Sequence, residues 1–156
     1  MATSGDLEPS LLTRRILDPA LSTLIRLGVM PSRIQLLTVA GRSTGKSHSV
    51  PVTPVDLGGR TYLVSPRGEL EWVRNIRVAG KGELRNGRRM RPISVTELPP
   101  YERAAVLKQY FRENKVAIGR YFTIKSADAS LSDFADEADR HPVFAVSFTD
   151  LADRRR

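Results

Sequence analysis

The stretch SHSVPVTPVDLGGRTYLV, residues 47–64, decides the fold of this chain of 156 residues. Side chains of a β-strand alternate between two faces, and the alternating valines and prolines predict one strand from Ser47 to Leu57. Gly58-Gly59 is a two-residue hairpin signal, and Thr61 to Val64 form the returning strand. The stretch therefore predicts antiparallel β-structure.

The turn just before this stretch, AGRSTGKS at residues 40–47, matches two catalytic motifs. Its end, Gly45-Lys46-Ser47, fits a relaxed phosphate-binding P-loop, and Gly41 to Gly45 has the G-x-S-x-G spacing of a hydrolase nucleophile elbow. Both motifs require a helix directly after the turn, but Pro51 and Pro54 exclude a helix there. The sequence therefore argues against a nucleoside triphosphatase and against a serine hydrolase.

What remains is a basic, glycine-rich turn between two strands. Gly41 and Gly45 would let backbone N–H groups converge, and Arg42 and Lys46 add positive charge. These features favour an anion-binding turn, and the alternative is an ordinary solvated β-turn.

The composition narrows the chemistry further. The chain has a net charge of +8, no cysteine and two histidines. The cysteine and histidine counts exclude disulfides, thiolate catalysis, cysteine-ligated zinc and a His-rich metal site. The basic charge favours an anionic partner, which can be a nucleic acid, a membrane surface or a phosphorylated or polycarboxylate small molecule. From Arg74 to Arg91 seven basic residues accompany one acid, Glu83, but no aromatic side chain is present to stack on bases. We therefore predict a solvated basic face and no specific nucleic-acid site.

The rest of the chain alternates strands with helices. Strands are predicted at residues 34–39, 83–85, 88–98 and 143–148, and helices at residues 69–78, 101–115 and 130–140. Asn86-Gly87 signals a second hairpin, and Pro92 suggests that its second strand lies at an edge or contains a bulge. About six mostly antiparallel strands with peripheral helices predict a single α+β domain at residues 31–150.

The two ends are predicted to differ from this domain. Residues 1–10 are expected to be disordered, and residues 151–156 to form a basic tail. Residues 11–30 form an N-terminal helical segment that Pro19 interrupts, and it packs either on the core or on a membrane or partner surface. No run is long enough to span a bilayer and no secretion signal is present, which predicts a cytoplasmic protein, with peripheral membrane contact through residues 11–30 as the alternative.

Two runs carry a family resemblance: LLTVAGRSTGKSHSVPV at residues 36–52 and YLVSPRGELEWVRNIRVAGKGELRNGRR at residues 62–89. Together they resemble the deazaflavin-dependent nitroreductase and F420H2-dependent quinone reductase family, over residues 34–148. The resemblance implies a split β-barrel that binds coenzyme F420. It also implies hydride transfer from the reduced deazaflavin to an electron-poor, hydrophobic acceptor such as a quinone, an enone or a nitro compound, without a metal.

The resemblance also implies a set of site residues. Those that would meet the coenzyme's phosphate and acidic tail are Arg42, Thr44, Gly45, Lys46 and His48. Pro51 and Val52 would lie near the ring or its linker. The opposite wall of the cofactor site would consist of Ser65, Arg67, Gly68, Glu71, Trp72 and Asn75. Ser65 is the candidate for a hydrogen bond near the reacting atoms, Tyr121 is a candidate proton donor, and Tyr110 and Tyr121 are the candidates for the substrate side.

Two other functions stay open at this point. A split barrel can use flavin mononucleotide (FMN) in place of F420, and the basic surface also suits a non-catalytic module that binds anions or nucleic acid. Split barrels often pair and this family includes monomers, so both a monomer and a homodimer are compatible with the sequence.

Overall fold

The computed structural model describes residues 33–149. The predictions for residues 1–10, 11–30 and 151–156 fall outside the described residues.

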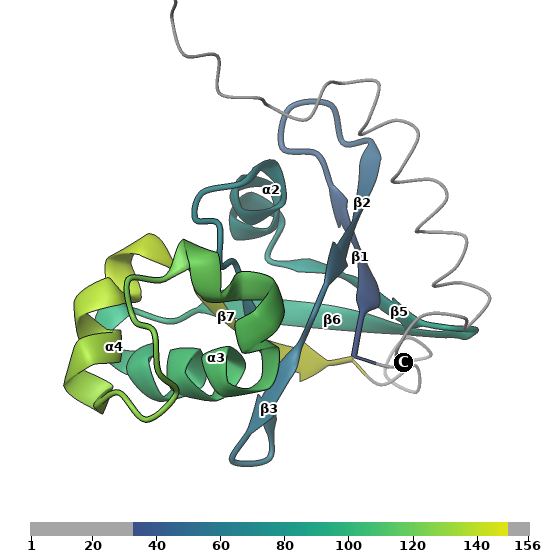
Figure 1. Cartoon of the computed structure of the whole chain (residues 1–156). Helices are drawn as coiled ribbons and strands as arrows, with labels where there is room; N and C mark the ends of the chain where they lie inside the picture. The colour runs from purple at the N-terminus through teal and green to yellow at the C-terminus, as the bar shows by residue number, and fades with distance from the viewer. Residues whose placement is uncertain (1–32, 150–156) are drawn as a thin grey trace, which may run out of the picture.

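Within residues 33–149, seven strands form one antiparallel sheet in the order β2-β1-β5-β6-β7-β4-β3 (Figure 1). In chain order the strands are β1 (Gln35–Ala40), β2 (Ser47–Val52), β3 (Val55–Leu57), β4 (Arg60–Val64), β5 (Lys81–Asn86), β6 (Arg89–Glu97) and β7 (Val143–Phe148). The helices are α2 (Glu71–Ala79), α3 (Ala104–Ile118) and α4 (Leu131–Glu137), with short 3-10 turns η1 (Pro100–Glu102), η2 (Gly119–Tyr121) and η3 (Ala138–Arg140). The α+β, mostly antiparallel prediction is confirmed.

The strand expected over residues 47–57 is in fact two strands, which raises the count from about six to seven. Val52 ends β2, where it lies opposite Gln35 of β1, whereas Val55 begins β3, where it lies opposite Tyr62 of β4. Pro54 has no backbone N–H with which to continue a ladder, so the chain breaks there and changes neighbours. As a result β2 and β3 lie at opposite ends of the strand order although only Thr53 and Pro54 separate them.

Pro92 does not mark an edge, because β6 lies between β5 and β7. The paired register of β6 with β7 begins at Ile93 and Phe148, and the Pro92 carbonyl accepts a hydrogen bond from the Thr149 N–H at 3.0 Å. The missing N–H of Pro92 therefore costs one hydrogen bond at the end of a ladder, where an inner strand tolerates it.

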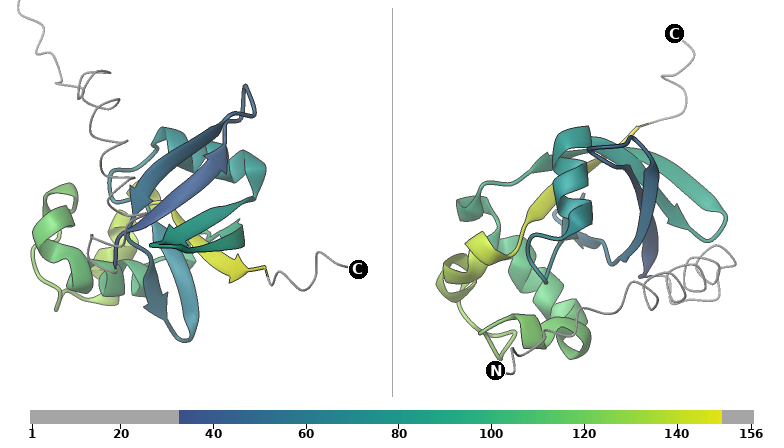
Figure 2. Two further views of the ribbon diagram at one scale, coloured as in Figure 1. Left: turned by 90° about the vertical axis from the view of Figure 1, so that its right-hand side faces the viewer. Right: turned by 90° about the horizontal axis from the view of Figure 1, so that it is seen from above.

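The curled sheet carries a hydrophobic core on each face. One core lies between the sheet and α2 and includes Leu37, Leu63, Val73, Ile76 and Phe144. The other lies beneath α3 and α4 and includes Val64, Leu107, Phe111, Phe134 and Val143. Neighbouring residues of β4 and β7 contribute to different cores because strand side chains alternate. Figure 2 shows the sheet curving around α2, with α3 and α4 together at the other side.

Candidate functional site

The turn between β1 and β2, residues 41–46, is closed by its own backbone. The Gly41 N–H donates to the Lys46 carbonyl at 2.8 Å, and the Gly45 N–H donates to the Gly41 carbonyl at 2.9 Å. Gly45 has a φ of 71°, a conformation that favours glycine. The Lys46 N–H donates to Thr44 Oγ1 at 3.3 Å. The N–H groups of both glycines are therefore occupied inside the turn, and anion binding by its cationic side chains and remaining N–H groups stays a prediction.

Helix α2 holds this turn through Arg42. Asn75 Oδ1 accepts hydrogen bonds from the Arg42 backbone N–H at 3.2 Å and from Arg42 Nη1 at 2.8 Å, and Asn75 is only 5% exposed. Arg42 Nη1 also lies 2.8 Å from Glu71 Oε2, and Glu71 Oε1 accepts from Arg74 at 3.2 Å. The hydrogen bond from Arg42 holds the pKa of the Glu71 carboxyl below its usual value. These contacts bring Arg42, Glu71 and Asn75 together, and their role in binding the coenzyme stays a prediction.

The loop that leads into α2 is folded on itself at Ser65. This serine is fully buried, and its hydroxyl donates to the Gly68 carbonyl at 2.6 Å. Its backbone N–H donates to the Pro142 carbonyl at 2.9 Å. Gly68 has a φ of 87°, which explains why glycine suits this position. In this structure the Ser65 hydroxyl shapes the loop, and a contact with reacting atoms stays a prediction.

The two candidate tyrosines occupy different surroundings. Tyr121 is half-buried, its hydroxyl accepts from Arg120 at 2.8 Å, and the Arg67 guanidinium lies 5.8 Å from its ring centroid. The fold thus brings Tyr121 next to Arg67 of the 65–70 loop. Tyr110 is 3% exposed in the core under α3, and burial raises the pKa of its hydroxyl to about 12. Its position is that of a core residue.

The other predicted cofactor-binding residues belong to β2 and α2. Trp72 packs in the barrel core, with its ring centroid 6.0 Å from that of Phe144, and Val52 belongs to the same core. Pro51 is half-buried, whereas His48 is exposed, with its ring against Gly41. The turn 41–46, the first turn of α2 and the 65–70 loop therefore meet at the N-terminal end of α2.

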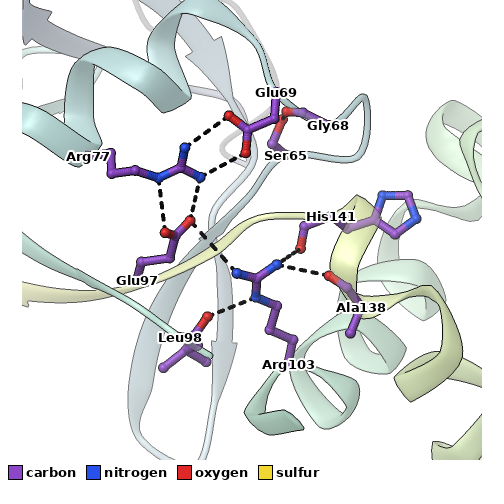
Figure 3. Close-up of polar contacts among 9 residues, drawn as sticks. All are labelled: Ser65, Gly68, Glu69, Arg77, Glu97, Leu98, Arg103, Ala138 and His141. Atoms are coloured by element: carbon purple, nitrogen blue, oxygen red, sulfur yellow. Dashed lines mark hydrogen bonds and ion pairs between the residues drawn. The ribbon is translucent and has the colours of Figure 1, made fainter. Parts of the chain in front are cut away.

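A polar network behind this region was not predicted (Figure 3). Arg77 bridges Glu69 and Glu97, with its Nη2 lying 2.8 Å from one carboxylate and 2.7 Å from the other. Glu97 in turn lies 3.8 Å from Arg103, whose side chain is 8% exposed. The network fixes Glu69, the residue that follows Gly68, to β6 and α3. No local sequence signal links these residues, which are up to 34 positions apart.

Glu137 and His141 form a second unpredicted cluster, in which both residues are 2% exposed. Glu137 Oε2 lies 3.1 Å from His141 Nε2. Their spacing of four residues was the available signal, since such pairs face each other on a helical turn.

Two further observations concern the described part of the chain. Among residues 33–149 no cluster of three or more His, Cys, Asp or Glu side chains could hold a metal ion. Over the same residues, no helix has both the length and the apolar character needed to cross a membrane.

Comparison with solved structures defines the class of fold, the split β-barrel. An F420-H2 dependent reductase superposes with a TM-score of 0.53 at 24% sequence identity, covering 74% of this chain and 94% of that one. A protein described as a domain-swapped dimer gives a TM-score of 0.54 at 22% identity, covering 87% of this chain and 97% of that one. A protein of unknown function from Agrobacterium tumefaciens str. C58 gives 0.51 at 10% identity, covering 83% of this chain and 56% of that one.

The sequence places the chain within this class. Residues 22–128 match the model of the F420H(2)-dependent quinone reductase family, so the chain belongs to that family. The protein is accordingly an F420-dependent reductase, and its cofactor is coenzyme F420. A search of curated proteins gave no match.

Proposed function

We propose that this reductase binds the anionic part of coenzyme F420 where the turn 41–46 meets α2. The observation that carries the proposal is the Arg42 contact with Glu71 and Asn75, which fixes the cationic turn beside the start of the helix. The Arg42 side chain is 33% exposed and Lys46 is exposed, so both cations are accessible to a ligand. The first turn of α2 also lacks a side-chain cap, which favours negative charge nearby. This donor set fits a phosphate and a glutamyl tail.

The chemistry follows from the cofactor. The reduced deazaflavin supplies a hydride, and the acceptor we propose is an electron-poor, hydrophobic molecule such as a quinone, an enone or a nitro compound. The chain's own contribution is to bind the anionic tail, to exclude water and to orient the acceptor. We assign the 65–70 loop to the wall of the cofactor site, with Ser65 near the reacting atoms, and Tyr121 to the acceptor side. The relative described as a domain-swapped dimer supports a homodimer as the assembly.

A side-by-side titration tests the proposal. The full chain is titrated with F420, FMN and NADPH, and binding is followed by fluorescence. We expect saturable binding of F420 alone, and a faster loss of reduced-coenzyme absorbance when menadione is added to the protein with F420H2. Saturable binding of FMN with none of F420 would instead identify a flavin enzyme, and no binding of either would refute the proposed site.

The ion pair between Arg42 and Glu71 leads to a specific prediction. The Glu71 carboxylate competes with an anionic ligand for Arg42, because both need the same guanidinium. Glu71→Gln is therefore expected to tighten F420 binding about three-fold, which is the change in affinity expected when one weak exposed ion pair no longer competes. Asp128→Asn, which removes one exposed acidic charge elsewhere, is the control and should leave the dissociation constant unchanged. Weaker binding in Glu71→Gln would show that Glu71 itself contacts the coenzyme.

A further inference from the structure

The His141 imidazole is buried at the back of the 65–70 loop. Its Nδ1 lies 2.9 Å from the Pro66 carbonyl oxygen, and its ring stacks on Phe122 with centroids 4.0 Å apart and planes inclined by 18°. The Pro66 carbonyl can only accept, so Nδ1 is the donor in this contact, and a second donation from Nε2 to the Glu137 carboxylate requires a ring that carries both protons. His141 therefore holds the loop at its second residue, across 75 positions of sequence.

Glu137 fixes the other side of the ring. Its Oε2 lies 3.1 Å from His141 Nε2, and its Oε1 accepts from the Ile124 N–H at 2.8 Å and from the Thr123 hydroxyl. Burial raises the pKa of the Glu137 carboxyl, but the hydrogen bonds from Thr123, Ile124 and His141 outweigh burial and hold the pKa below its usual value. Glu137 thus ties the segment after Tyr121 to the same imidazole.

The surrounding backbone reinforces this attachment. The Ser65 N–H donates to the Pro142 carbonyl at 2.9 Å, directly after His141. A side-chain Cβ at Gly68 would lie 3.4 Å from the Arg140 carbonyl oxygen, so the loop runs close against this segment. The His141 carbonyl itself faces Arg103 Nη1 at 3.5 Å (Figure 3). His141 is therefore held on several sides and can serve as a fixed support.

We propose that His141 is a positioning residue for the 65–70 loop and sets the distance of this loop from Tyr121. The loop, which we assign to the wall of the cofactor site, and the acceptor-side segment after Tyr121 converge on one buried imidazole. The loop reaches it through Pro66, and the segment reaches it through Phe122 and Glu137. The role at the active site rests on the proposed function, whereas the attachment of the loop does not.

Two substitutions separate the two hydrogen bonds of the ring. His141→Asn places an amide NH2 where Nδ1 stands and keeps the donor to Pro66, while His141→Gln places its NH2 where Nε2 stands and keeps the donor to Glu137. Both variants lose the stack on Phe122 equally, so each serves as the control for the other. His141→Phe keeps an aromatic ring but has no donor, and it replaces His141→Gln in the comparison if that variant does not fold.

The first measurement is amide hydrogen exchange of residues 65–70 in the protein without coenzyme. We expect exchange about ten-fold faster in His141→Gln than in His141→Asn, because only the first loses the bond to Pro66. Equal exchange in the two variants would overturn the proposal, whatever the protein binds.

The second measurement is the dissociation constant for F420, together with the melting temperature. In both variants Glu137 still holds the segment after Tyr121 through Thr123 and Ile124, so the 65–70 loop is the element expected to move. A displaced loop predicts about ten-fold weaker F420 binding in His141→Gln and a change within about two-fold in His141→Asn, at similar melting temperatures. A role in stability alone predicts that both variants melt lower and bind alike, which would overturn the role at the site. Failure of the wild-type protein to bind F420 would count against the proposed function, and the exchange experiment would still decide the attachment of the loop.

Discussion

The double variant Arg42→Ala/Lys46→Ala is expected to bind coenzyme F420 on the order of 100-fold more weakly than the wild-type protein. Each lost cation removes a charge-assisted hydrogen bond to the anionic tail, and two such bonds contribute about 3 kcal/mol or more. Folding should change little, because the Arg42 backbone N–H still donates to Asn75 and Lys46 is exposed. The measurement is a fluorescence titration at two salt concentrations, since binding through charge weakens as salt increases.

The matched control is Arg88→Ala/Arg89→Ala, which removes the same net charge from the hairpin between β5 and β6. Strand β1 pairs with β5 so that Leu36 lies opposite Arg85 and Thr38 lies opposite Glu83, which places this hairpin at the far end of β1 from the turn. We expect its affinity to stay within about two-fold of wild type. Equal losses in both double variants would mean that net charge attracts the coenzyme and that the turn is not the site.

Arg103→Ala is expected to destabilise the protein more than any exposed substitution. The side chain is 8% exposed, and its guanidinium donates to the carbonyl oxygens of Leu98 at 2.8 Å and Ala138 at 2.9 Å. Without it, the Leu98 carbonyl after β6 loses the Arg103 donor, and the Ala138 carbonyl in η3 keeps only the His141 N–H at 3.3 Å. Breaking such contacts costs about 3 kcal/mol, which corresponds to a melting temperature lower by about 6–12 °C.

Arg112→Ala provides the comparison for this prediction, because Arg112 lies on the same helix α3 and is exposed. Its melting temperature is expected to stay within about 2 °C of wild type. Thermal unfolding of both variants, followed by circular dichroism, measures the difference. Similar shifts would show that the buried network around Arg103 contributes no more than an ordinary surface charge.

The sequence predicted those elements whose signals are local. Gly58-Gly59 and Asn86-Gly87 form the two expected hairpins, and all three glycines have positive φ. Gly80 ends α2 in the left-handed conformation, and Ser130 caps α4 with Asp133 in a capping box. Each of these features depends on residues within a few positions of each other, so pattern and propensity are sufficient to find them.

The rest depends on contacts between distant positions. Arg42 reaches Asn75 across 33 residues and His141 reaches Pro66 across 75, and no periodicity reports such pairs. The resemblance supplied Arg42, Glu71 and Asn75, which the fold does bring together. It did not supply His141 or Arg103. Their contacts with Pro66, Leu98 and Ala138 are to backbone carbonyls, which no residue type reveals. The break at Pro54 was missed because an alternating pattern does not say which neighbour each half of a strand will pair with.

That break determines how the sheet closes. Strands β2 and β3 are the two outermost members of the sheet, yet they follow one another along almost one line in the chain (Figure 1). The seam of the barrel is therefore spanned by covalent bonds of Thr53 and Pro54, and closing so short a loop costs little chain entropy. Cutting the chain between Thr53 and Pro54 would leave β2 and β3 as two edge strands that no covalent link holds together. Unpaired edge strands are the surfaces through which β-proteins associate with one another.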